Sequence, residues 1–125
     1  MGAETLRKRP VVLVIEDEPL ILMHALNIVS DAGFEALEAR NADEAIRILE
    51  SREDIRIVFT DINMPGSMDG LKLAHAVRHR WPPIQIIVTS GYGSADKRDL
   101  PAGARFFKKP YQASHIARTL WELAG

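Results

Sequence analysis

Short apolar runs alternate with stretches of helical periodicity along the chain. The first run, residues 10–15, is continuous and rich in β-branched side chains, which is typical of a strand covered on both faces. Comparable runs occur later in the chain at 55–60, at 84–88 and, more weakly, at 104–107, with a half-polar candidate at 34–39. The pattern therefore predicts five strands.

Between these runs, apolar residues recur three and four positions apart, the spacing that forms one stripe along a helix. Such stripes lie within residues 21–32, 42–49, 73–81 and 116–123. Each stripe predicts an amphipathic helix that packs on a sheet. Strands and helices alternating in this order predict a parallel sheet with right-handed crossovers, which is a doubly wound α/β fold.

Residues with known capping preferences mark the predicted helix boundaries. Asn41 followed by Glu44 predicts an N-cap with a capping-box partner, and Gly33 can close the preceding helix. Trp81 is followed by two prolines, which end the third helix. Between residues 92 and 103, a proline and glycines leave room for little more than one turn, so we expect a short or irregular helix there.

Length and composition narrow the classes of protein. A chain of 125 residues suits one domain, so we assign residues 1–9 to a polar leader and residues 10–125 to the domain. A net charge of −1 disfavours a nucleic-acid-binding domain. The absence of cysteine excludes thiol nucleophiles and cysteine metal sites and suits a cytoplasmic protein. No apolar run is long enough for a membrane span, and the leader lacks a signal-peptide core.

Polar residues follow four of the predicted strands directly. In a parallel α/β sheet these positions meet at one edge, where the ligand crevice lies. The residues concerned are Glu16, Asp17 and Glu18; Asp61 and Asn63; Thr89 and Ser90; and Lys108 and Lys109. Carboxylates, a hydroxyl and a lysine are thus expected within reach of one small anion.

Crowded carboxylates repel one another, and a hard divalent cation keeps them ionised. Oxygen ligands favour Mg²⁺ or Mn²⁺. If Asp61 is a nucleophile, it attacks a phosphorus atom and becomes an acyl phosphate, while Lys109 and Ser90 hold the other phosphoryl oxygens.

Each of these residues also has a structural reading. The acids at 16–18 suit a helix N-terminus, and Asp61 alone suits a turn. Their joint placement at four strand ends favours the chemical reading. His75 and His79 could share a helix face and bind zinc, but the sequence offers no third ligand nearby, and we assign them no role.

The motifs together resemble the receiver domain of two-component response regulators, the CheY-like family, and the resemblance covers essentially the entire chain. Its marks are the acidic motif at 16–18, the loop Asp61-Ile62-Asn63-Met64-Pro65, the pair Asp69-Gly70, the pair Ser90-Gly91, and Lys109-Pro110, a peptide bond that is often cis in this family. The resemblance implies the strand order 2-1-3-4-5 with helices on both faces.

The resemblance also implies residue roles. Asp61 would accept a phosphoryl group from a histidine kinase or phosphotransfer protein. Mg²⁺ would be bound by Asp17, Asp61, the backbone carbonyl of Asn63 and, directly or through water, Glu16. Ser90 and Lys109 would contact the phosphoryl group, and Phe106 would occupy the position of the aromatic switch.

The sequence departs from the family pattern at several positions. Glu16 stands where Asp is commoner, and Phe106 replaces a frequent Tyr. Thr89 and Lys108 each offer a neighbouring alternative, but the residues that follow favour Ser90 and Lys109. The loop before Asp69 is one residue longer than in the chemotaxis protein of the family.

We therefore predict a receiver that is not a metabolic enzyme, signals to an unknown protein partner in trans, and has no DNA-binding domain or membrane segment. One alternative is a Mg²⁺-dependent phosphohydrolase with an aspartyl-phosphate intermediate. Such an enzyme would want an acid two residues after the nucleophile, where this chain has Asn63. Another alternative is an interaction module that has lost phosphorylation. The complete set of residues for accepting a phosphoryl group argues against it.

Overall fold

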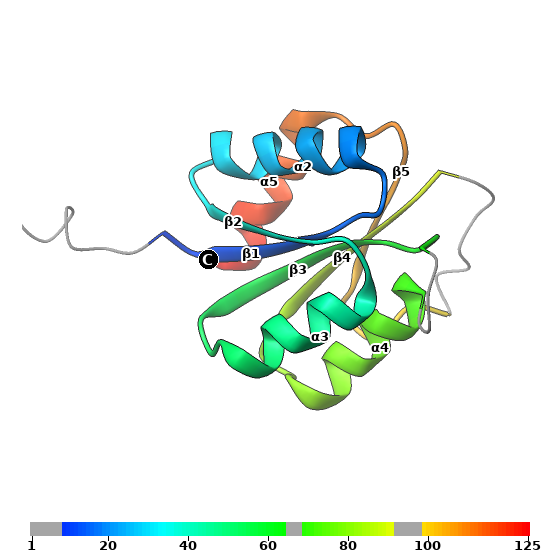
Figure 1. The fold of residues 1–125 in the computed structure, drawn as a ribbon. Helices are drawn as coiled ribbons and strands as arrows, with labels where there is room; N and C mark the ends of the chain where they lie inside the picture. Colours follow the sequence, from blue (N-terminus) through cyan, green and yellow to red (C-terminus); the bar gives the residue numbers. More distant parts are fainter. Residues whose placement is uncertain (1–8, 65–68, 92–98) are drawn as a thin grey trace, which may run out of the picture.

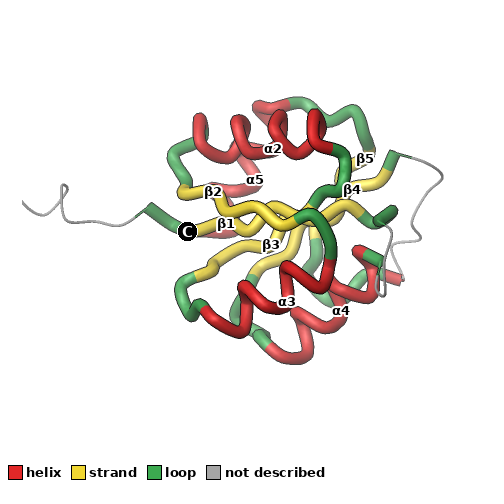
Figure 2. The backbone as a smooth tube through the Cα atoms, in the orientation of Figure 1, coloured by secondary structure: helices red, strands yellow, loops and turns green. Residues whose placement is uncertain are grey.

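The computed structural model describes residues 9–64, 69–91 and 99–125. Its centre is a five-stranded parallel sheet with the order β2-β1-β3-β4-β5, which confirms the predicted fold and strand order. Helices α2 and α5 cover one face of the sheet and helices α3 and α4 cover the other (Figure 1). Figure 2 shows the same three layers by secondary structure.

The elements follow one another in the predicted alternation. The strands are β1 (Val11–Ile15), β2 (Glu35–Ala39), β3 (Ile55–Asp61), β4 (Gln85–Ser90) and β5 (Arg105–Lys108). The helices are α2 (Pro19–Asp31), α3 (Ala42–Ser51), α4 (Gly70–Arg80) and α5 (Ala113–Ala124). None of these helices combines the length and apolar character needed to cross a membrane.

Two hydrophobic cores lie on opposite faces of the sheet, because alternate strand residues point in opposite directions. Along β1, Leu13 and Ile15 pack on the side of α3 and α4. Val12 and Val14 pack on the side of α2 and α5. All of β1 is buried, which explains why its sequence is a continuous apolar run.

The last strand matches its sequence signal least well. β5 is an edge strand with exposed or half-buried residues, and it runs from Arg105 to Lys108 where we predicted 104–107. The boundaries of the other four strands also shift by one or two residues. Most of the predicted short helix between β4 and β5 lies outside the described residues.

The predicted caps are present, with one correction. The Asn41 side chain accepts a hydrogen bond from the Glu44 amide at 2.8 Å, as an N-cap should. The Glu44 carboxylate, however, accepts from the amide of Arg40 at 3.1 Å and not from that of Asn41. Gly33 has a positive φ of 100° after α2, and Trp81 is the C-cap of α4.

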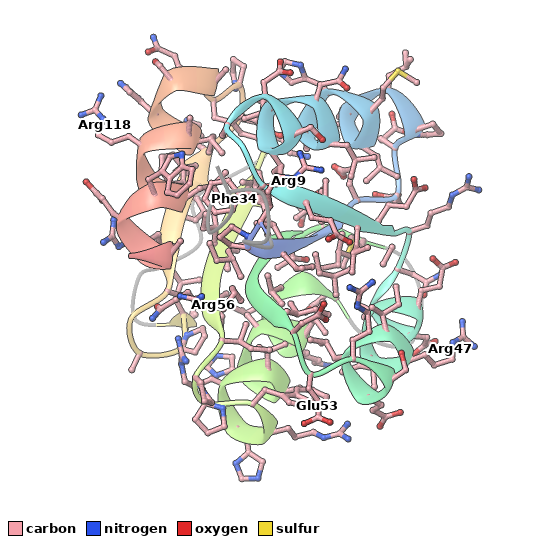
Figure 3. The ribbon with its side chains drawn as sticks, turned by 90° about the vertical axis from the view of Figure 1, so that its left-hand side faces the viewer. Arg9, Phe34, Arg47, Glu53, Arg56 and Arg118 are labelled. Atoms are coloured by element: carbon pink, nitrogen blue, oxygen red, sulfur yellow. The ribbon has the colours of Figure 1, made fainter. Side chains whose placement is uncertain are left out.

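The helices run back along the strands, so the C-terminal ends of α2 and α5 lie at the amino ends of the strands. There the Trp121 indole N–H donates to the carbonyl of Ala32 at 2.8 Å, and Arg56 donates to the carbonyl of Ala124 at 2.7 Å. Figure 3 looks onto this end of the molecule, with Phe34 and Arg56 labelled. We call it the amino end of the sheet and the opposite edge the carboxyl end.

Candidate functional site

Asp61 is the last residue of β3, a central strand, and its side chain is only 8 % exposed. Neighbouring β1 ends at Ile15, so the next two residues, Glu16 and Asp17, come to lie beside Asp61. Carboxylate oxygens of the three acids lie within 4.8 Å of one another. The predicted convergence of these acids at the carboxyl end is therefore present.

Lys109 follows β5 at the edge of the sheet and reaches back to the acids. Its Nζ donates to Oε1 of Glu16 at 2.9 Å and to Oδ2 of Asp61 at 3.1 Å. Its backbone N–H donates to the carbonyl of Ser90 at 2.8 Å, which anchors the loop to β4. The Lys109–Pro110 peptide is cis, as the resemblance implied.

The charges in this cluster influence one another strongly. Burial raises the pKa of Glu16 to about 7, although its hydrogen bond to Lys109 acts in the opposite direction. Burial by itself lowers the pKa of Lys109, but the hydrogen bonds to Glu16 and Asp61 outweigh it, so that pKa lies above its ordinary value. Lys109 therefore remains protonated, and Glu16 is neutralised by protonation more easily than an ordinary glutamate.

The acids also fit a hard divalent cation. All the ligand atoms offered are carboxylate oxygens, the type that Mg²⁺ and Mn²⁺ prefer. Oε2 of Glu16 is buried and has no hydrogen-bond partner among the described residues. A buried carboxylate oxygen without a donor is unfavourable unless a cation or a proton satisfies it. The residues present therefore suit Mg²⁺, and Glu16, Asp17 and Asp61 would supply its side-chain oxygens.

Asn63 connects the phosphoacceptor candidate to the end of β4. Its backbone N–H lies 3.3 Å from Oδ1 of Asp61, and its side-chain N–H₂ lies 3.4 Å from Oγ of Ser90. Both contacts are long for hydrogen bonds. The Asn63 side chain is an amide, so no acid stands two residues after Asp61.

The strand register distinguishes Ser90 from Thr89. β4 pairs with β5 so that Val88 lies opposite Phe106, and both pack on the side of α3 and α4. Ser90, two residues after Val88, shares that side of the sheet, whereas Thr89 faces the other. The predicted phosphoryl-binding hydroxyl of Ser90 and the ring at the predicted switch position, Phe106, thus lie on one face. Phe106 is half-buried there.

An open cleft of about 780 Å³ leads from the acids to the surface. Its walls include residues of α2 and of the loop after β5 to which the sequence motifs assign no role. They are Leu20, Ile21, His24, Pro110 and Tyr111. The His24 and Tyr111 rings stack with their centroids 6.3 Å apart. The position of Tyr111 directly after Lys109-Pro110 was a signal that could have identified it.

The comparisons with known proteins agree with this geometry. The family model of the response regulator receiver domain matches residues 12–120. The chain belongs to this family. It is a receiver of the two-component response regulators, and its fold serves phosphorylation-based signalling.

Relatives of the receiver include the hydrogenase transcriptional regulatory protein HoxA of Cupriavidus necator, 35% identical over 90% of this chain and 24% of that protein. The nitrogen assimilation regulatory protein NtrX of Azorhizobium caulinodans is 31% identical over 84% of this chain and 24% of that protein. The chain thus spans about a quarter of the length of these relatives.

Solved structures show the same fold. The receiver domain of NtrX from Brucella abortus superposes with a TM-score of 0.80 at 29% identity, covering 90% of this chain and 96% of that one. A response regulator receiver protein from Sinorhizobium medicae superposes with a TM-score of 0.86 at 24% identity, covering 92% and 94% of the two chains, which shows the shared fold alone.

Proposed function

We propose that Asp61 is the phosphoacceptor and that it takes a phosphoryl group from a histidine kinase or phosphotransfer protein in a Mg²⁺-dependent reaction. The observation that carries the proposal is the contact of Lys109 with both Glu16 and Asp61, because Lys109 and Asp61 line the cleft. An anion-binding cation, a nucleophilic carboxylate and two further acids for a metal stand together there and nowhere else in the described residues.

In this reaction a carboxylate oxygen of Asp61 attacks phosphorus in line with the bond to the donor. That P–N bond breaks, the donor imidazole leaves with the electron pair, and an acyl phosphate remains on Asp61. When bound by Glu16, Asp17, Asp61 and the Asn63 carbonyl, Mg²⁺ neutralises charge on the phosphoryl oxygens.

The residues around the acceptor then respond to new negative charge. Lys109 contacts Glu16 and Asp61 before transfer, and we infer that it moves to pair with the phosphoryl group afterwards. Ser90 donates its hydroxyl to a phosphoryl oxygen. Because Ser90 and Phe106 share one face of the sheet, movement of the hydroxyl changes the space open to the ring. This response would present a changed surface to a partner protein in the cytoplasm.

The phosphohydrolase alternative is not favoured. Its second acid is absent, because an amide at Asn63 cannot act as a general base on an attacking water. We propose instead that catalysis by this receiver is limited to phosphorylation and dephosphorylation of its own Asp61.

The test is incubation with Mg²⁺ and acetyl phosphate, followed by intact-mass measurement. We expect one phosphoryl adduct on the wild type and on Asp31→Asn, which alters an exposed acid of α2 as a matched control. Asp61→Asn should show none, and removing Mg²⁺ should suppress the wild-type adduct. Absence of an adduct under every donor and metal condition would contradict the proposal, and rapid multiple turnover of donor would favour the hydrolase.

A further inference from the structure

Helix α4 begins closer to the phosphoacceptor than any side chain would permit. Gly70, its first residue, is buried against the end of β3. A Cβ at this position would lie 1.7 Å from the carbonyl oxygen of Asp61 and 2.8 Å from Cα of Ile62. Both are backbone atoms, which cannot rotate away. The φ of Gly70 is not positive, so glycine is required here by space and not by conformation.

Hydrogen bonds hold the same stretch of backbone from three directions. The Gly70 N–H donates to the carbonyl of Ile62 at 2.9 Å, so the first turn of α4 binds the residue after the acceptor. The Ile62 N–H donates to the carbonyl of Thr89 at 2.8 Å. The hydroxyl of Thr60, which is fully buried, donates to the carbonyl of Asp61 at 3.0 Å.

This fixation matters because Asp61 is where β3 ends. Its carboxylate must keep its place 3.1 Å from Nζ of Lys109 and within 4.8 Å of carboxylate oxygens of Glu16 and Asp17. A displacement of about 1 Å at a reacting group can reduce a rate on the order of 100-fold. The groups that hold the Asp61 backbone in place are therefore expected to affect the rate of phosphoryl transfer.

We propose that Gly70 and Thr60 are positioning residues for phosphoryl transfer. Gly70 allows α4 to seat directly beneath the Asp61–Ile62 peptide, and Thr60 holds the carbonyl of that peptide, so that the carboxylate is presented at a fixed place. This inference rests on the proposed function of Asp61.

The main variant is Gly70→Ala. Real Cβ contacts stay beyond 3.0 Å, so α4 and the Asp61 peptide would have to separate by more than an ångström. We expect the maximal phosphorylation rate constant of the folded protein to fall roughly 10- to 100-fold. The acetyl phosphate concentration for half-maximal rate should change little, because the cleft that admits the donor is not altered.

The matched control is Gly33→Ala at the amino end of the sheet. Gly33 has a φ of 100°, and a Cβ there would lie 3.3 Å from the Trp121 ring, so alanine is strained at this position too. We expect Gly33→Ala to lower the unfolding midpoint while leaving the phosphorylation rate constant of folded molecules unchanged. Loss of stability alone is thereby separated from misplacement of Asp61.

A second variant, Thr60→Val, removes the hydroxyl that donates to the Asp61 carbonyl without adding volume. It tests the inference even if Gly70→Ala does not fold. We expect its maximal rate constant to fall by several-fold with an unchanged half-saturating donor concentration, and Thr60→Ser, which keeps the hydroxyl, to recover the rate. Wild-type rates for Gly70→Ala, or for Thr60→Val where only that variant folds, would overturn the inference. A wild-type protein that takes no phosphoryl group would instead overturn the proposed function.

Discussion

The charged side chains at the two ends of the sheet differ in their burial and in their charge balance. At the amino end, Arg105 and Glu122 pair one to one at 3.2 Å, with side chains 46% and 52% exposed. At the carboxyl end, Glu16 and Asp61 share the single cation Lys109, and their side chains are 4% and 8% exposed. The first arrangement is balanced and solvated, whereas the second is buried and has an excess of negative charge.

The two arrangements differ in what they contribute to stability. A solvated pair contributes little to stability, and its loss is easily tolerated. Buried carboxylates in excess of cations disfavour folding unless a proton or metal compensates them. The carboxyl end thus holds an excess of buried negative charge that a proton or a bound cation would compensate.

The largest expected effect comes from neutralising Glu16. Its pKa is about 7 in the folded protein against an ordinary 4.5, so folding favours the protonated form. That contribution is complete below the unfolded pKa and is lost as pH rises through 7. In EDTA at about pH 8, Glu16→Gln should therefore be up to about 3 kcal/mol more stable than wild type.

Urea unfolding in EDTA across the pH range measures this effect. The wild type should lose stability relative to Glu16→Gln between pH 4.5 and 7, the two pKa values concerned. Curves that stay parallel would show that Glu16 does not carry the buried charge.

The second effect is stabilisation by Mg²⁺. A ligand that binds only the folded state at a hundred times its Kd adds about 2.7 kcal/mol. We expect Mg²⁺ to raise the free energy of unfolding of the wild type by this amount. The increase should be much smaller for Asp17→Asn. Thermal unfolding with and without Mg²⁺ is the measurement, with Asp31→Asn as the control that responds like wild type. An equal response of Asp17→Asn would remove Asp17 from the ligand set.

A smaller effect is expected at the amino end. Trp121→Phe removes the indole N–H that binds the carbonyl of Ala32 while keeping an aromatic ring near Phe34. The free energy of unfolding should fall by about 1 kcal/mol, independently of Mg²⁺. Denaturant unfolding measures the loss, and a changed phosphorylation rate in this variant would break the separation of the two ends.

The smallest effect is expected for the solvated pair. Arg105→Ala should change the free energy of unfolding by less than about 0.5 kcal/mol, and the change should vanish in high salt. Unfolding in low and high salt tests this, and a loss as large as that of Trp121→Phe would show that the amino end also depends on its charges.

Most of the fold could be predicted from the sequence, because burial of a strand or helix produces a simple pattern of apolar residues. β1 is buried on both faces and reads as an unbroken apolar run, whereas the edge strand β5 is half exposed and its boundaries were misplaced. Propensity and periodicity report burial, and they report it weakly at an edge.

The acidic cluster was also predictable, because parallel strands bring their carboxyl ends together. We did not predict the hydrogen bond from Lys109 to Glu16. We also did not predict the close approach of Gly70 to the Asp61 carbonyl. Both depend on how far a side chain reaches and how closely a helix approaches, which spacing along the chain does not encode.

The most direct test of the central claim is chemical mapping of the phosphorylated residue. The wild-type protein is phosphorylated with acetyl phosphate and Mg²⁺, reduced with borohydride, which converts an acyl-phosphorylated aspartate to homoserine, and then mapped by peptide mass spectrometry. We predict homoserine at position 61 alone, and none when Mg²⁺ is omitted. Homoserine at Asp17 or another acid, with Asp61 intact, would contradict the assignment of Asp61 as the phosphoacceptor.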